Sequence, residues 1–153
     1  MTEPDSPLDL EAISERYFAA WAARDPDAIA DLHTEDTTFW SHLGTDPVRG
    51  RNRVRDNFAE LFELFPELGF DTHRVLYGAG FWVLDWDLTF LTPGSDERSG
   101  FHCLDVVDVA SDGLVSRKET FVDMVQLQAV LPGRDVGAEA AEVGAGVGRG
   151  VSA

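Results

Sequence analysis

Hydrophobic residues in the first part of the chain recur every three or four positions, which is the period of a helix with one apolar face. The first such stripe consists of Leu10, Ile13, Tyr17, Ala20 and Trp21. Asp25 followed by Pro26 is typical of a helix start and predicts a short second helix over residues 27–32. A further apolar stripe predicts a third helix over residues 52–65, which Pro66 ends.

After that proline, apolar and polar residues alternate, as they do in strands with one buried face. Four such runs cover residues 70–77, 81–91, 101–110 and 114–124. A shorter strand is predicted over residues 37–40, where β-branched and aromatic residues follow one another. The short connections between the long runs require antiparallel neighbours. Helices followed by a meander of strands therefore predict an α+β fold, with three N-terminal helices packed on a curved antiparallel sheet.

The two ends of the chain lack these patterns. Residues 1–8 have no periodicity and predict a flexible lead-in, whereas residues 131–153 are rich in glycine and alanine and predict a flexible tail. One α+β domain is therefore expected over residues 9–130.

Charge and composition narrow the classes of partner. The 28 acidic residues outnumber 12 basic ones, for a formal net charge of −16, so nucleic acid and anionic membranes are poor partners. No apolar run approaches the roughly 20 residues of a membrane span, and the acidic start lacks the features of a signal peptide. A cytoplasmic protein is expected.

Few residues have the spacing of a metal or cofactor site. The single cysteine, Cys103, excludes an internal disulfide and a cysteine-rich zinc site. The four histidines are His33, His42, His73 and His102, and they are scattered over separate predicted elements. No glycine-rich phosphate loop follows a strand. We therefore predict neither a metal nor a cofactor.

Several motifs along the chain, in this order, resemble one known superfamily. They are residues 16–21 with Asp25, residues 35–40, Gly50, residues 104–107 before Asp112 and Gly113, and residues 121–123. Their order and spacing, over residues 10–130, resemble the nuclear transport factor 2 superfamily and in particular its SnoaL-like polyketide cyclase and ketosteroid isomerase-like branch. The resemblance implies a cone-shaped fold around a deep, mostly apolar pocket, and often a homodimer. It does not fix a reaction, because this scaffold carries isomerases, cyclases, dehydratases, epoxide hydrolases and non-catalytic binders.

The resemblance to ketosteroid isomerase draws attention to Tyr17 and Asp105. By spacing, they match the tyrosine and the aspartate that form the oxyanion hole of that enzyme. An aspartate that faces an apolar cavity tends to hold its proton and can then donate a hydrogen bond. In the alternative interpretation, Tyr17 is a core aromatic residue whose hydroxyl is satisfied by a neighbour, and Asp105 is its partner.

The chain departs from the isomerase at the catalytic carboxylate, where it has Ser41 followed by His42. Serine cannot abstract a carbon-bound proton at neutral pH without help, which disfavours steroid isomerisation. His42 would replace the base if the strand end turned it inward. The alternative is a surface histidine at a turn.

Asp85 and Asp87 alternate with a run of large apolar residues. That run is Trp82, Leu84, Trp86, Leu88 and Phe90. Two carboxylates on one face would suit an acid and base pair of the epoxide hydrolase type, but the arginine of such a site is missing. Because five apolar positions are hard to leave in water, we favour outward-facing aspartates. His102 is also expected on the outer face.

Lys118 and Thr120 share their parity with each other and are expected to point into the cavity if Asp105 does. Lys118 is expected to form an ion pair with Asp105 rather than to act as a nucleophile. The residues expected to bind substrate are Trp40, Ser41, Trp82, Trp86, Phe101, Lys118 and Thr120.

The leading hypothesis is a cofactor-independent enzyme that transfers protons on a small, largely apolar, carbonyl-bearing substrate, by cyclisation, isomerisation or dehydration. Tyr17 and Asp105 would stabilise the developing enolate oxygen, and His42 would move the proton. The rival is a non-catalytic ligand-binding or dimerisation module on the same fold. The serine at position 41 favours the module, whereas Asp105 favours the enzyme. A homodimer through the outer sheet face is expected in either case.

Overall fold

The computed structural model describes residues 7–131 of the chain. The helices are α1 (Leu10–Ala22), α2 (Pro26–Ala30), α3 (Arg51–Leu64) and α4 (Met124–Val130). The strands are β1 (His33–Ser41), β2 (Val48–Arg49), β3 (Gly69–Gly78), β4 (Phe81–Leu91), β5 (Arg98–Val109) and β6 (Val115–Val122). Most of the predicted lead-in and all but the first residue of the predicted tail lie outside the described residues.

The six strands form one curved, open sheet in the order β2-β1-β6-β5-β4-β3. The strands from β3 to β6 are antiparallel to their neighbours, as the meander pattern predicts. β1 instead runs parallel to β6, which corrects the prediction of a wholly antiparallel sheet. The short connections that force antiparallel pairing join only consecutive strands, whereas residues 42–114 separate β1 from β6.

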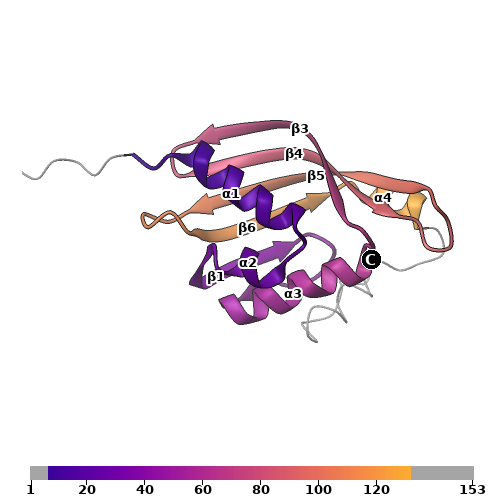
Figure 1. Ribbon diagram of the computed structural model, residues 1–153, viewed down its shortest axis with the longest axis horizontal. Coiled ribbons are helices and arrows are strands. Elements are labelled where there is room, and N and C mark those ends of the chain that lie inside the picture. The colour runs from indigo at the N-terminus through magenta and orange to yellow at the C-terminus, as the bar shows by residue number, and fades with distance from the viewer. Residues whose placement is uncertain (1–6, 132–153) are drawn as a thin grey trace, which may run out of the picture.

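The three N-terminal helices lie on one side of this sheet, and α4 packs at the end of β5 (Figure 1). α1 crosses β3 and β4, whereas α3 packs against β1 and β2. The first two helices begin where the sequence predicts, because aspartate side chains accept hydrogen bonds from exposed backbone N–H groups there: Asp9 from Ala12, and Asp25 from Asp27 and Ala28. The mixed α+β architecture is therefore confirmed.

α4 has no counterpart in the sequence prediction, which extends the last strand to residue 124. Asp123 ends that strand and caps the helix, since its carboxylate accepts a hydrogen bond from the Gln126 N–H. Leu127 is fully buried, and the Leu131 side chain is also buried one turn later. An aspartate cap followed by apolar residues four positions apart was the signal for this helix.

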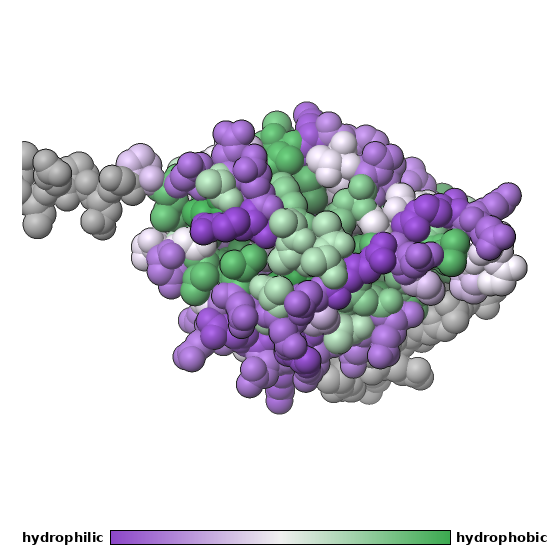
Figure 2. Space-filling model, viewed as in Figure 1, coloured by the Kyte–Doolittle hydropathy of each residue, from purple (hydrophilic) through white to green (hydrophobic). Residues whose placement is uncertain are grey.

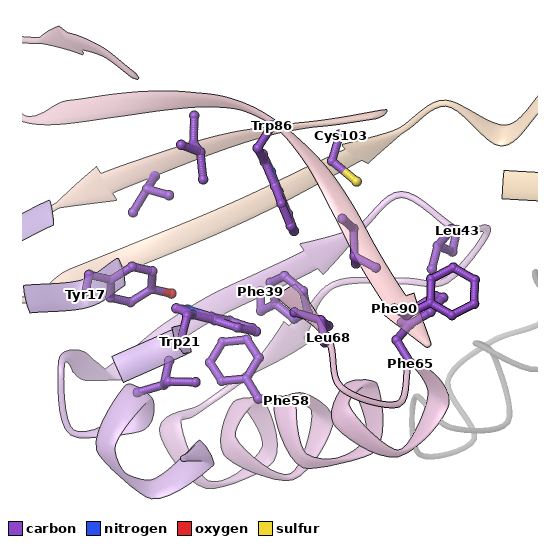
Figure 3. Packing of buried hydrophobic residues seen from close by; sticks show 14 of the residues in the cluster. Tyr17, Trp21, Phe39, Leu43, Phe58, Phe65, Leu68, Trp86, Phe90 and Cys103 are labelled. Atoms are coloured by element: carbon purple, nitrogen blue, oxygen red, sulfur yellow. The ribbon is translucent and has the colours of Figure 1, made fainter. Parts of the chain in front are cut away.

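Aromatic side chains fill the space between the helices and the sheet (Figure 3). The Trp21 ring packs edge-on against Phe58 with 4.8 Å between centroids, and Phe58 packs against Phe39 at 5.0 Å. Most of the exposed residues on the helical side are hydrophilic, and apolar residues gather toward the middle of that face (Figure 2). The core thus joins all three N-terminal helices to the concave sheet face.

Candidate functional site

A narrow apolar cavity lies within this core. Its apolar walls include Trp21, Phe39, Phe65, Trp86, Leu88 and Phe101, and Cys103 adds a thiol. The cavity holds about 460 Å³ of space free of protein atoms, its mouth included, but the centre of a water molecule can reach only about 40 Å³ of it. Since a water needs roughly 10–15 Å³ of such space, the cavity has room for a few water molecules.

Three residues with polar side-chain ends, Ser41, Lys118 and Thr120, also line the cavity. All three come from the parallel pair β1 and β6, where Ser41 lies opposite Thr120 and Phe39 opposite Lys118. Alternation along the two strands turns these side chains to the concave face. Trp86 lines the cavity as well, and its indole N–H has no hydrogen-bond partner among the described residues. The polar groups of the cavity are thus mainly hydrogen-bond donors.

Lys118 forms the expected ion pair with Asp105. Its Nζ lies 2.6 Å from Asp105 Oδ2, and the Thr120 hydroxyl donates to Oδ1 at 2.8 Å. The lysine and aspartate side chains are only 5% and 2% exposed. Lys118 lines the cavity, whereas Asp105 is not among the lining residues.

The Lys118 ammonium also lies near two aromatic rings. Its Nζ is 5.2 Å from the Trp21 ring centroid and 5.8 Å from that of Tyr17. The negative faces of such rings attract a cation, more strongly where water is excluded. Two rings and one carboxylate therefore hold this buried charge in one place.

Tyr17 has a histidine partner, which the sequence analysis missed. The Tyr17 hydroxyl lies 2.8 Å from His33 Nε2, and His33 Nδ1 lies 2.8 Å from the Thr37 hydroxyl. Burial, reinforced by the nearby charges of Lys118 and Arg51, lowers the pKa of His33 to about 3, so the imidazole is neutral at neutral pH. Burial also raises the pKa of Tyr17 far above its usual value, so the phenol keeps its proton.

Tyr17 therefore matches the alternative interpretation in one respect, because a neighbour satisfies its hydroxyl, although that neighbour is His33 and not Asp105. Tyr17 does not line the apolar cavity. It borders a separate, more polar depression that Arg16 and Gly113 also line.

His42 and Trp40 lie on the outer face of the sheet. Because Ser41, the last residue of β1, faces the cavity, Trp40 before it points the other way, and so does His42, whose N–H continues the pairing with β6 by donating to the Thr120 carbonyl. His42 stacks between Trp40 and Phe121, with centroids 4.2 and 4.1 Å away, and its Nε2 lies 3.0 Å from Glu119 Oε2. The strand end does not turn His42 inward, so the structure does not bring His42 to Asp105.

The remaining aromatic candidates divide between cavity and core. Trp86 and Phe101 line the cavity as expected. Trp86 points from the sheet toward Phe39 (Figure 3). Trp82 is fully buried but packs against Tyr17 and Phe18, with ring centroids 5.6 and 5.9 Å away, and is not a lining residue. Its role is packing beneath α1.

Asp85 and Asp87 face outward, which confirms the favoured interpretation. Asp85 lies 3.0 Å from Arg74 Nε and also pairs with His102, and these two partners hold the pKa of its carboxyl below the usual range. Asp87 lies 3.1 Å from His73 Nε2. His102 thus lies on the outer face too. Surface ion pairs, and not an acid and base pair, occupy this part of the sheet.

The described part of the chain shows no group of three or more histidine, cysteine, aspartate or glutamate residues that could hold a metal ion. The same residues contain no helix long and apolar enough to cross a membrane. Burial, with the negative charge of Asp105 nearby, raises the pKa of the Cys103 thiol well above its usual value. The cysteine in the cavity is therefore an unreactive thiol at neutral pH.

The curved open sheet, the N-terminal helices on its concave side and the small cavity between them define an α+β protein with an apolar cavity in its core. The chain belongs to the SnoaL-like domain family, whose family model matches residues 14–118. None of the curated proteins matches it in sequence.

Solved structures share its fold at low sequence identity. One is a protein from Jannaschia sp. CCS1 described as a SnoaL-like polyketide cyclase. It is 21% identical to this chain, with a TM-score of 0.71, and the match covers 87% of this chain and 99% of that one. SalBIII, described as an epoxide hydrolase/cyclase-like enzyme with a role in pyran ring formation in the polyether salinomycin, is 20% identical with a TM-score of 0.66, over 76% and 92%. A protein from Catenulispora acidiphila with a ketosteroid isomerase-like fold, bound to trimethylamine, is 12% identical with a TM-score of 0.68, over 81% and 92%. These neighbours establish the nuclear transport factor 2-like cone fold.

Proposed function

We propose that the protein is a cofactor-independent enzyme that promotes proton transfer on a small, apolar, carbonyl-bearing substrate. The observation that carries this proposal is the buried ion pair of Lys118 and Asp105 at the wall of an otherwise apolar cavity. A charged pair is costly to bury, and an apolar residue of similar volume would fill the same space more cheaply.

The geometry supports a role for Lys118 as the electrophilic group. A carbonyl oxygen in the cavity would accept a hydrogen bond from the Lys118 ammonium, which stabilises the negative charge that develops when a neighbouring C–H proton passes to a water molecule in the cavity. Asp105 and Thr120 fix the ammonium, and the apolar walls strengthen the interaction by excluding water. Trp86 offers a second N–H donor in the same space.

Cyclisation, isomerisation and dehydration all pass through such a stabilised oxygen, so the site suits this group of reactions. The resemblance to ketosteroid isomerase had given the role to Tyr17 and Asp105. We now assign direct contact with the substrate to Lys118, supported by Asp105, because Lys118 lines the cavity and the other two do not. The description of SalBIII, a neighbour in fold, as cyclase-like agrees with this group of reactions.

Exchange of α-protons for deuterium tests the proposal directly. Small ketones such as cyclohexanone and acetophenone are incubated with the protein in D2O, and loss of the α-proton signal is followed by NMR. We expect saturable acceleration by the wild type and none by the variant Lys118→Met/Asp105→Asn, which removes both charges together. Arg117→Met is the matched control, because Arg117 pairs with Glu119 on the outer face. Equal exchange by all three proteins would refute the role of Lys118.

A non-catalytic binding module is the second candidate. Ser41 supports it, because the cavity has a hydroxyl where the isomerase has a carboxylate. A ligand that binds in the cavity but exchanges no protons with any ketone offered would favour this candidate.

We also propose a homodimer through the outer sheet face. Leu104 and Val106 place apolar side chains there, and Phe121, on the same face, is 41% exposed. A cytoplasmic location stays a prediction from the sequence.

A further inference from the structure

We propose that Lys118 captures the carbonyl carbon of a small aldehyde or ketone as a Schiff base, so that the cavity is a site of covalent catalysis. This inference rests on the proposed function for the class of substrate, but it assigns Lys118 a second role, that of a nucleophile. Three observations carry it: the identity of residue 118, its contacts, and the chemistry of the cavity around it.

Lys118 is the only lysine in the chain, and the other 11 of the 12 basic residues are arginines. The exposed cationic positions, such as Arg53 and Arg74, therefore use a guanidinium, and the buried cavity position uses an amine. A guanidinium does not give up its proton in a protein and is a poor nucleophile, whereas an amine can do both. An ion pair alone would not require this difference, because arginine pairs with carboxylates at least as well.

The contacts of Lys118 provide both a place for its proton and an open path to the cavity. Nζ donates to Asp105 Oδ2 at 2.6 Å, and no second acceptor lies within hydrogen-bond distance among the described residues. Asp105 is held in turn by the Thr120 hydroxyl. Transfer of one proton along the Nζ–Oδ2 bond converts the ion pair into a neutral amine and a neutral carboxylic acid. The neutral pair is easier to bury, and the freed lone pair belongs to the side chain of a residue that lines the cavity.

Addition of the Lys118 amine to the carbonyl needs no reactant besides the substrate and Asp105. The Nζ lone pair forms a bond to the carbonyl carbon, and the carbonyl π pair moves to the oxygen, which takes the proton held by Asp105. The nitrogen of the resulting carbinolamine carries two protons and a positive charge, and it passes one of these protons to Asp105. The hydroxyl group takes that proton and leaves as water, and the nitrogen keeps the last proton. The products are an iminium cation and the Asp105 carboxylate. One water is released for each carbonyl captured, and Asp105 begins and ends as a carboxylate beside a positive charge.

The cavity walls suit such an intermediate. Trp21, Phe39 and Trp86 surround the space with apolar surface, which limits the water that would hydrolyse an imine. Cys103 also lines it, but the raised pKa of its thiol keeps sulfur protonated. The hydroxyls of Ser41 and Thr120 are weak nucleophiles without an adjacent base. The cavity thus leaves Lys118 as the group able to bond to a carbonyl carbon. An iminium so formed withdraws electrons from the neighbouring C–H bond, which serves the same proton transfer.

Borohydride trapping tests the inference, and a single lysine makes the result easy to assign. The full chain is incubated with benzaldehyde, reduced with sodium cyanoborohydride, and analysed by intact mass and by peptide mapping. We expect one benzyl group on Lys118, with a rate that saturates with benzaldehyde and is about tenfold or more above that of the α-amino group of the same molecules. This comparison uses the wild type alone and depends on no variant.

A matched control moves the lysine by one position. The double variant Arg117→Lys/Lys118→Arg keeps the composition and places the single lysine on the outer face. We expect it to react without saturation and at least about tenfold more slowly than Lys118 of the wild type. Modification of the α-amino group alone in the wild type, or an equal rate for the moved lysine, would overturn the inference.

The two experiments distinguish failure of the Schiff base from failure of the proposed proton-transfer function. If ketones exchange α-protons in a Lys118-dependent way but no benzyl group is trapped, Lys118 acts as a hydrogen-bond donor only, and the Schiff base is refuted. If neither exchange nor trapping occurs, the proposed function is refuted as well.

Discussion

The Tyr17 hydroxyl and His33 Nε2 are joined by a buried hydrogen bond of 2.8 Å. The bond connects the middle of α1 to the first residue of β1, and α2 lies between these two elements in the sequence. The sequence offers no pattern that links these two residues. The partner of the buried Tyr17 phenol is therefore a neutral histidine and not a charged group.

Removing the hydroxyl tests the strength of this connection. We expect Tyr17→Phe to lower the free energy of unfolding by about 2 kcal/mol, because His33 Nε2 loses its partner in a place that water does not reach. Urea denaturation followed by circular dichroism measures the change. Tyr77→Phe is the control: its hydroxyl lies 2.8 Å from Ser14 Oγ, but Tyr77 is 45% exposed, and Ser14 keeps a bond to Glu11. A cost for Tyr17→Phe no larger than that of the control would contradict the prediction.

The low pKa of His33 predicts a loss of stability in acid. The folded state has a pKa of about 3 and the unfolded chain about 6.5, so as pH falls from 6.5 to 3 the unfolded state takes up a proton that the folded state does not. The free energy of unfolding therefore falls with pH in that window, by up to about 3 kcal/mol between pH 7 and pH 4 from this residue.

His33→Gln removes this contribution, and we expect its unfolding free energy to fall less steeply over the same window. His73→Gln is the matched control, because Asp87 raises the pKa of His73 and gives a dependence of opposite sign. Unfolding at several pH values compares the three proteins. Parallel curves for the wild type and His33→Gln would show that His33 is not the titrating group.

The buried ion pair predicts a contrast between single and double substitutions. Lys118→Met leaves the Asp105 charge without a partner, and we expect it to cost about 3–5 kcal/mol of unfolding free energy. Lys118→Met/Asp105→Asn should recover most of that loss. Arg74→Met breaks the pair with Asp85 but at a side chain that is 64% exposed, so we expect less than about 1 kcal/mol. Similar costs for the two single variants would contradict the burial of the pair.

Cys103 provides a probe of the cavity. The thiol is buried and its pKa is raised, so the folded protein should react with a disulfide reagent much more slowly than the protein in urea. Absorbance after addition of Ellman's reagent measures the rate at pH 8. Rapid reaction of the folded protein would mean that the cavity opens widely in solution.

The proposed dimer is tested by one substitution on the outer face. Light scattering at micromolar concentration should give about twice 16.8 kDa for the wild type. Phe121→Glu should reduce it to the monomer, because the carboxylate would be buried between two copies. Asn52→Glu introduces the same residue on α3 and should leave the mass unchanged. A wild type that remains monomeric would exclude the dimer.

Much of the fold follows from short-range patterns. The helix stripes and the alternating runs predicted α1, α3 and the four long strands, because each period reflects one buried face. The parallel pairing of β1 and β6 could not be predicted in this way. It depends on which residues far apart in the chain meet, and no local pattern records that.

The site was harder to predict than the fold. Parity placed Asp105, Lys118 and Thr120 on one face, and the ion pair between the first two is present. Strand alternation also predicts that His42 points away from the face of Ser41. The hypothesis that His42 is the base needed a kink at the strand end, and the structure has His42 on the outer face. His33 escaped notice because a histidine at the start of a strand has no periodic signature, and its burial depends on α1 and α3 packing above it.

The parallel pair also determines when the cavity can exist during folding. Lys118 reaches its position only when β6, near the end of the described chain, meets β1, which follows the second helix. Loop closure over such a distance is slow compared with hairpin formation, so the β3–β6 meander can assemble before the strand that supplies Ser41 and Phe39 joins it. A nascent chain released before β6 would lack Lys118 and Thr120, and β1 would have no strand to join it to β5.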